Sequence, residues 1–288
     1  MRRLAILGVL VSSTAIADDR RPDASFADMF RGPFASSRLF AMPTADVIGA
    51  YIVSLSGDGS LLQSPGRLTS AAVVAIGFGD LAQLEYRETA AISVTGVDAP
   101  VPAAGVQLKL PIPERPYVPA FGLALRVGVA RREVVGATTV DETVNDLYAV
   151  ARERLGALVL HGGLRVSSAH LVLGGDQMLD KQRTVWLPAA GAEVVMNRDA
   201  RLVVEATAAP QFRMAGTIGY GVLARAGVRW KLLPSVTFDA TLGYQLAENS
   251  GLGEGPSDVV SAWDIRLGAE VFVPWGALAC RATGAFCE

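Results

Sequence analysis

Two neighbouring segments decide the fold: residues 219–231, GYGVLARAGVRWK, and residues 236–246, VTFDATLGYQL. In the second, apolar side chains occupy every other position, and Thr, Asp, Gly or Gln stands between them. In the first, Arg225, Arg229 and Lys231 alternate with Ala, Val and Trp in the same way. Because successive side chains of a strand point to opposite faces, this period of two predicts strands with one apolar and one polar face.

The same texture continues from about Val47 to Trp275, for example in residues 117–131 and 262–275. The alternating segments reach the roughly 9–11 residues that a tilted strand needs to cross a bilayer. Arg, Glu and Gly populate the polar face, which suits the inside of a barrel with lipid outside. An open sheet edge in lipid would leave backbone groups unpaired, so the sheet must close. The sequence therefore predicts an all-β, closed, antiparallel transmembrane barrel.

About twelve strands are expected, an even number that brings both ends of the barrel chain to the same side. The segments between them alternate between long and short, as extracellular loops and periplasmic turns do in bacterial barrels. The candidate strands are residues 46–56, 67–79, 82–94, 104–111, 117–131, 146–154, 157–167, 184–196, 201–213, 219–231, 236–246 and 261–274.

Composition excludes other classes. Apolar residues make up 51% of the 288 and mean hydropathy is +0.34, yet beyond the N-terminus no apolar run reaches the ~18 residues of a membrane helix. Net charge is -2 and the pI is about 5.8, so no basic footprint indicates a nucleic-acid partner.

The two ends of the chain predict export. Arg2 and Arg3 precede the apolar stretch 4–11, and Ala15-Ile16-Ala17 fits a small-x-small cleavage site, so residues 1–17 are expected to be a signal peptide. Residues 18–45 are expected to be a periplasmic N-terminal segment, 46–275 the barrel, and 276–288 a periplasmic tail. The two cysteines, Cys280 and Cys287, could close a small loop in that tail.

Aromatic residues gather near strand ends, as the interfacial girdles of barrels do. Trp186, Tyr220, Tyr244 and Trp263 are expected near the outer interface, and Trp230 and Trp275 near the periplasmic one.

On these features the chain resembles bacterial outer-membrane β-barrel proteins as a class. Its last strand, with Leu267, Val271 and Phe272 before Val273-Pro274-Trp275, is similar to the aromatic-ended final strand that such proteins present to the assembly machinery. The resemblance implies a place in the outer membrane, contact with its lipid, and the barrel-assembly machinery as a partner during biogenesis.

Charged residues near strand centres fall on the inward face. The positive side chains expected there are Arg87, Lys109, Arg126, Arg152, Arg165, Arg225, Arg229 and Arg266, and the negative ones are Glu85, Glu193, Glu205, Asp239, Asp264 and Glu270. These could line a polar channel for small solutes, with the arginines slightly favouring anions. They could equally pair with one another and rigidify a closed barrel.

Three functions stay open on the sequence. A narrow channel for small solutes or ions is the leading interpretation, and a structural or anchoring barrel with a closed lumen is the alternative. A lipid-modifying enzyme is less favoured, because such chemistry needs a Ser–His pair. His161 falls mid-strand on the inward face and His170 in the predicted loop 168–183, and neither spacing supplies that pair. No cofactor and no metal site are expected, since two separated histidines lack a carboxylate cluster.

Overall fold

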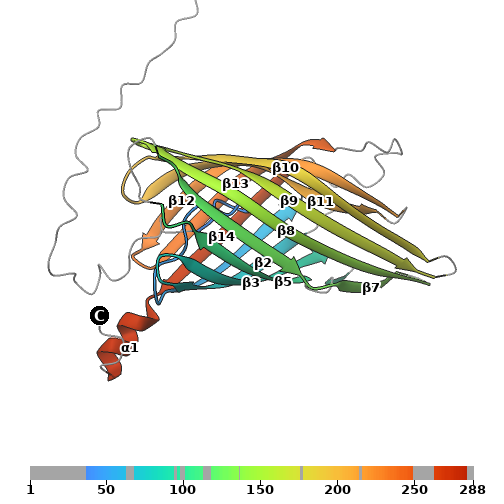
Figure 1. The fold of residues 1–288 in the computed structure, drawn as a ribbon, viewed down its shortest axis with the longest axis horizontal. Coiled ribbons are helices and arrows are strands. Elements are labelled where there is room, and N and C mark those ends of the chain that lie inside the picture. Colours follow the sequence, from blue (N-terminus) through green and yellow to red (C-terminus); the bar gives the residue numbers. More distant parts are fainter. Residues whose placement is uncertain are drawn as a thin grey trace, which may run out of the picture.

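The computed structural model describes residues 37–62, 68–93, 96–97, 101–112, 118–135, 137–175, 178–213, 216–248 and 263–283. Their long strands form a closed antiparallel barrel of twelve strands, shown in Figure 1. The predicted fold class is therefore confirmed. The signal peptide expected over residues 1–17 lies outside the described residues.

Each barrel strand pairs with the strand before and after it, and the first pairs with the last. The barrel strands are β1 (Val53–Leu62), β2 (Leu68–Phe78), β3 (Ala82–Ser93), β5 (Val101–Lys109), β6 (Ala120–Gly128), β8 (Thr138–Leu155), β9 (Leu158–Gly174), β10 (Leu179–Val195), β11 (Ala200–Arg213), β12 (Thr217–Leu233), β13 (Val236–Glu248) and β14 (Trp263–Val273). Two short strands, β4 (Gly96–Val97) and β7 (Arg131–Val135), pair with β3 and β8, and one helix, α1 (Trp275–Thr283), follows β14.

Closure is made by β1 and β14, which pair from Val53↔Val273 to Leu62↔Asp264. Since hydrocarbon offers no hydrogen-bond partners, an unpaired edge there would cost several kcal/mol for each lost bond. The β1–β14 ladder removes that edge. Among the described residues, the structure contains no helix long and apolar enough to span a membrane.

The predicted faces hold where the alternation is cleanest. On β6, Leu123 and Leu125 point outward with 39% and 46% of their surface exposed, whereas Ala124 between them is 3% exposed. On β13, Thr237 is 1% exposed and Leu242 is 48% exposed. An apolar exterior of this kind is the surface that lipid covers.

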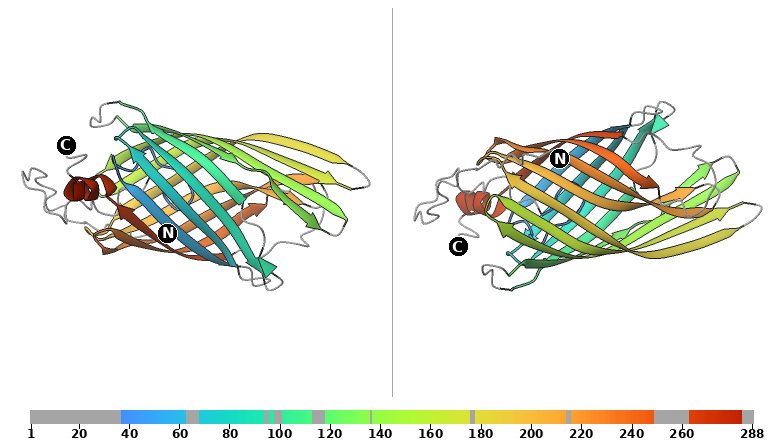
Figure 2. Two further views of the ribbon diagram at one scale, coloured as in Figure 1. Left: turned by 90° about the horizontal axis from the view of Figure 1, so that it is seen from below. Right: turned by 90° about the horizontal axis from the view of Figure 1, so that it is seen from above.

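Several strand limits differ from the prediction. The first strand begins at Val53 rather than at residue 46. Most of the predicted outer loops 132–145 and 168–183 is strand, because β8, β9 and β10 each run for 17 or 18 residues. Figure 2 shows these strands reaching well past the others at the end opposite α1. The stretch TTVDETV over 138–144 is rich in β-branched Thr and Val, which favour strands.

Tyr220 was expected in the outer aromatic girdle, and this prediction is wrong. Its side chain is 4% exposed and packs inside the barrel. The pairing of β12 with β13 shifts register between Val222 and Leu223. The extra residue, Leu246, stands on β13. Tyr220 and Arg225 are both largely buried although their numbers differ in parity, so strict alternation does not hold along this part of β12. Trp186 and Trp230 lie outward as expected, at 68% and 55% exposure.

Helix α1 occupies most of the predicted tail. It begins where β14 ends, and Figure 1 shows it beyond the strands at one end of the barrel. Cys280 is disulfide-bonded, and Cys287 lies outside the described residues.

The outward face of β6 can be tested with Leu125→Arg. A cation at the lipid-facing midplane should lower the free energy of unfolding by about 2–4 kcal/mol, measured by urea titration of the barrel refolded in vesicles. Val134→Arg on β7 is the matched control. Val134 is 69% exposed, and β7 pairs with the first residues of β8 rather than with the middle of the barrel wall. Equal unfolding midpoints for the two variants would contradict the assigned lipid face.

Candidate functional site

Eleven of the twelve predicted pore-lining residues lie on the inward face of the described wall. Asp264 is the exception, because its side chain is outside the described part. Most of these charged groups have partners of opposite sign, as the nitrogen–oxygen distances show: Arg126–Glu85 3.2 Å, Arg165–Asp146 2.8 Å, Arg201–Glu193 2.7 Å, Arg225–Glu205 3.5 Å, Arg229–Asp239 2.8 Å and Arg266–Asp58 3.5 Å.

These ion pairs lie along the wall rather than across the lumen. Five of the six join adjacent strands, such as Arg229 on β12 and Asp239 on β13. The sixth, Arg126–Glu85, crosses over β5 at Gly105, where an added Cβ would stand 3.3 Å from Cγ of Arg126. The wall charges therefore neutralise one another without blocking the lumen by themselves.

The lumen is occupied by residues 37–48, here called the luminal segment. Sequence analysis assigned residues 18–45 to a segment outside the barrel, and for residues 37–45 this is corrected by the structure. Figures 1 and 2 show the blue chain that precedes β1 within the outline of the strands. Leu39 and Met42 have no exposed surface and Ala45 has 1%. The available signal was the apolar content of Leu39–Met42, unusual for a segment outside the barrel.

The luminal segment folds back on itself as a tight hairpin. Arg38 and Pro43 form an antiparallel bridge, and the Leu39 N–H donates to the Met42 carbonyl at 2.9 Å. Phe40 and Ala41 stand at the tip. Because the tip has few internal hydrogen bonds, its backbone must find partners in the wall.

Glu205 of β11 supplies most of them. Its carboxylate accepts the backbone N–H groups of Phe40 at 3.0 Å, Ala41 at 3.0 and 3.1 Å, and Met42 at 3.2 Å. The Glu205 side chain is completely buried, and Arg225 lies 3.5 Å away as its counter-charge. Hydrogen bonds to a charged acceptor are worth about 1.5–3 kcal/mol each in general, so this carboxylate is the principal anchor of the hairpin tip.

Two arginines bind the carbonyl groups of the same tip. Arg229 donates to the carbonyls of Arg38 at 3.1 Å and Leu39 at 2.6 Å. Arg126 donates to the carbonyl of Ala41 at 3.1 Å. The wall thus forms hydrogen bonds with both the N–H groups and the carbonyl groups of the hairpin main chain.

Polar side chains of β3 and β5 hold the rest of the segment. Gln107 reaches three carbonyls, those of Ser37, Thr44 and Asp46, at 3.1, 2.8 and 2.6 Å. Gln83 accepts the N–H of Ile48 at 3.0 Å. The main chain of the luminal segment is therefore solvated by the wall in place of water.

The Asp46 carboxylate adds a charged contact. It lies 2.5 Å from an Arg152 guanidinium nitrogen and 3.7 Å from Lys109 Nζ. Both cations belong to the barrel wall, so this carboxylate ties the base of the segment to β5 and β8.

Apolar packing completes the seat. The buried side chains of Leu39, Phe40, Met42 and Ala45 form one cluster with wall residues, most of them small: Ala120, Ala124, Tyr148, Val150, Ala189 and Val203. At Gly191 an added Cβ would lie 2.2 Å from Cδ1 of Leu39 and 2.8 Å from the Val204 carbonyl oxygen, so a side chain there would displace its neighbours. Burying a Leu, Phe or Met side chain contributes about 1.5–3 kcal/mol each. The fit of large residues of the luminal segment against small wall residues indicates a specific binding site for the segment.

The segment joins β1 through a turn at the mouth of the barrel. Tyr51 has a φ of 56°, a conformation that L-residues rarely adopt. Its N–H donates to the carbonyl of Gly77, its carbonyl accepts the N–H of Gly276, and its ring meets Trp275 edge-on at 5.5 Å. Helix α1 and the turn therefore brace each other at this end.

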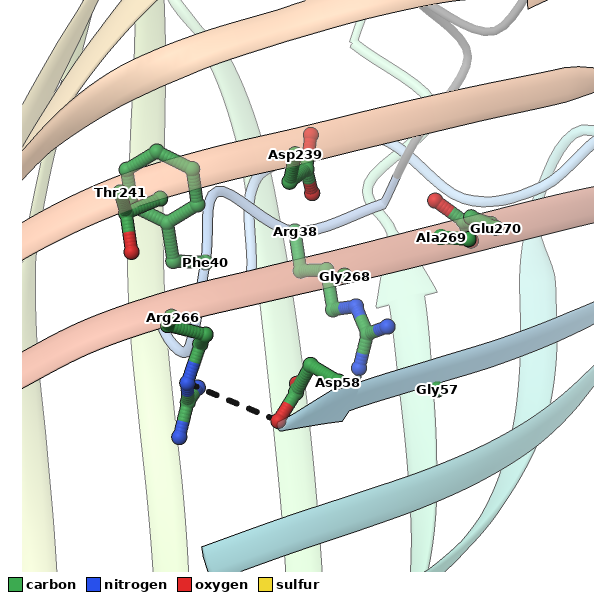
Figure 3. Close-up of a pocket in the computed structure, with 10 residues that line it drawn as sticks. All are labelled: Arg38, Phe40, Gly57, Asp58, Asp239, Thr241, Arg266, Gly268, Ala269 and Glu270. Carbon is green, nitrogen blue, oxygen red and sulfur yellow. Dashed lines mark ion pairs between the residues drawn. The ribbon is translucent and has the colours of Figure 1, made fainter. Parts of the chain in front are cut away.

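A small cavity remains beside the hairpin. Its volume is about 20 Å³, enough for one or two waters. Figure 3 shows Arg38 and Phe40 of the luminal segment facing the Arg266–Asp58 ion pair across it.

The opposite end of the lumen carries a second apolar cluster. Its buried members come from β8, β9 and β12: Val140, Ala169, Leu171, Leu173, Ile218 and Tyr220. Arg183 stacks over the Tyr220 ring at 5.6 Å. This end of the lumen is therefore apolar, whereas many of the groups that contact the main chain of the luminal segment are polar.

The histidines lie apart from each other. His161 Nε2 is 2.9 Å from Glu193 inside the barrel, and His170 Nε2 is 2.8 Å from Asp180 at an exposed position. Within the described ranges, no group of three or more His, Cys, Asp or Glu side chains is arranged to hold a metal ion.

Two solved structures share this architecture. The NanC porin has a TM-score of 0.50 and 10% identity over 75% of this chain and 98% of that chain. An outer membrane channel from Pseudomonas putida F1 has a TM-score of 0.51 and 12% identity over 81% of this chain and 97% of that chain. No protein-family model and no curated protein matches the chain. At these identities the likeness concerns the fold alone: the chain has the closed β-barrel fold that these outer-membrane proteins have.

The Glu205 seat can be tested with Glu205→Gln. The amide keeps the size of the side chain but loses its charge, and the hairpin should lose about 2 kcal/mol of binding. The measurement is the rate at which a thiol reagent labels Met42→Cys, a position with no exposed surface in the native barrel. We expect labelling about tenfold faster or more.

The matched control is Asp146→Asn, which removes another buried wall carboxylate, one that pairs with Arg165. It should leave the labelling rate unchanged. Equal acceleration by both variants would show that the effect comes from general loosening of the barrel.

Proposed function

We propose that this protein is a narrow outer-membrane channel for small solutes or ions, gated by its own luminal segment. The observation that carries the proposal is that a separate piece of chain, seated by hydrogen bonds and ion pairs, fills the lumen. Apart from its chain connection to β1, the luminal segment is held by noncovalent contacts and can leave its site, whereas wall side chains cannot leave the wall.

Barrel size supports this interpretation. Eight strands enclose a lumen that side chains fill, and sixteen or more leave an aqueous channel. Twelve strands lie between these limits. Here the wall charges pair mainly between neighbouring strands, so these ion pairs do not fill the lumen. The luminal segment occupies the space that they leave.

A closed structural barrel is the second candidate. The apolar cluster around Leu171 and Tyr220 favours it, because this cluster narrows the lumen at the end opposite the hairpin. In that case the luminal segment would be a permanent part of the core. The two candidates differ in whether weakening the Glu205 seat opens a path.

The surroundings proposed for the barrel follow from its exterior. The outward apolar side chains, such as Leu125 and Leu267, would contact outer-membrane lipid, and the barrel-assembly machinery would insert the chain. The proposal gives neither His161 nor His170 a catalytic role.

Single-channel recording in planar bilayers separates the two candidates. We expect the wild-type protein to be closed most of the time, with brief discrete openings. Glu205→Gln should raise the fraction of time open about tenfold or more, because each 1.4 kcal/mol changes an equilibrium tenfold. Asp146→Asn should behave like the wild type. A correctly folded Glu205→Gln barrel that stays silent would exclude the gated channel and leave the closed barrel.

A further inference from the structure

Arg87 differs from the other charged residues of the lumen. It lies on the inward face of β3, and within the described residues its guanidinium makes no ion pair at salt-bridge distance. Its Nε is buried and has no hydrogen-bond partner there. Nη2 of Arg126 is buried and lacks a partner in the same part of the chain. Buried donors without acceptors are rare and call for a specific explanation.

The sheet register brings these two donors to one corner of the lumen. Glu85, Gly105 and Arg126 form one row across β3, β5 and β6, and Arg87 stands in the next row. In that row its neighbours are Ala103 on β5 and, beyond it, Gly128 on β6. These positions carry a methyl group or no side chain, and an added Cβ at Gly105 would meet Cγ of Arg126 at 3.3 Å. No wall side chain larger than a methyl group therefore stands between the two arginines along these rows.

Arg126 is held in position by its neighbours. Its Nε pairs with Glu85 at 3.2 Å, and another nitrogen donates to the Ala41 carbonyl. The guanidinium also stacks on the Tyr148 ring at 5.4 Å, and Arg165 stacks on that ring at the same distance. These contacts fix the plane of the guanidinium and therefore the direction of its remaining donor.

Charge in this corner is uneven. Glu85 stands beside both Arg87 and Arg126, and Arg38 of the luminal segment also acts on Arg87. Asp58 also acts on Arg87, but its carboxylate is shared with Arg266. Neither carboxylate serves Arg87 alone, and a buried charge without a full counter-charge is costly.

From these observations we propose that Arg87 and Arg126 form a binding site for a small oxyanion, of the phosphate or carboxylate type. The planar donor fork of a guanidinium matches two oxygens of such an anion. The site lies beside the seat of the luminal segment, because Arg126 also holds Ala41. The inference deepens the proposed function, on which its role in transport rests, by naming small anions as the solute class.

Binding is tested on the full-length protein in detergent, with inorganic phosphate as the probe. The thermal unfolding midpoint is followed as phosphate replaces chloride at constant ionic strength. We expect phosphate to raise the midpoint of the wild type, and Arg87→Gln to weaken the apparent phosphate affinity about tenfold or more. Arg132→Gln is the matched control, since Arg132 is exposed and paired with Asp141 on the β7–β8 hairpin. It should keep the wild-type response.

A gain-of-affinity variant guards against a folding defect in Arg87→Gln. Glu85→Gln removes the carboxylate that competes for Arg126, so phosphate should bind more tightly than in the wild type. A midpoint that ignores phosphate in both the wild type and Glu85→Gln would overturn the site and leave water as the partner of these donors. Phosphate binding in a barrel that never conducts would keep the site and overturn the channel. Channel currents without phosphate binding would keep the channel and overturn the site.

Discussion

A backbone polar group that leaves water must find another partner, and this constraint acts twice in the molecule. In the wall, the β1–β14 ladder supplies partners for the strands that would otherwise face lipid as open edges. In the lumen, side chains supply partners for a hairpin that has few hydrogen bonds of its own. Glu205 binds three consecutive N–H groups there, and Arg229 binds two carbonyls.

The charged residues of the wall have two uses as a result. Their pairing keeps Arg and Glu compatible with a buried position, and the groups that remain available hold the luminal segment. Glu205 shows both uses, because it faces Arg225 on one side and the hairpin tip on the other. Arg126 does the same with Glu85 and Ala41. The inward face of the wall therefore balances its own charges and also binds the luminal segment.

Sequence patterns gave the barrel class and most strand positions because lipid and lumen impose different chemistry on alternate residues. The faces of β6 and β13 follow directly from this alternation. Tyr220 was misplaced because strict alternation does not hold along this part of β12, where Tyr220 and Arg225 are both largely buried although their numbers differ in parity. The lengths of β8 to β10 were underestimated because strands outside the membrane no longer need an apolar face.

The luminal segment was missed for a different reason. Its contacts with Glu205, Gln107 and Arg229 join residues more than 60 positions apart and use its main chain, which carries no sequence signature. The inward direction of Glu205 and Arg229 could be predicted from the strand period. What they bind could not, because the partners come from a segment without strand periodicity.

The central claim is that the luminal segment lies inside the barrel in the cell envelope. A photo-crosslinking amino acid in place of Phe40, whose ring lies 5.9 Å from the Arg229 guanidinium, tests it most directly in intact cells. Irradiation should link residue 40 to peptides of β11 or β12 within the same chain. Crosslinks to other proteins, with none inside the chain, would contradict the account.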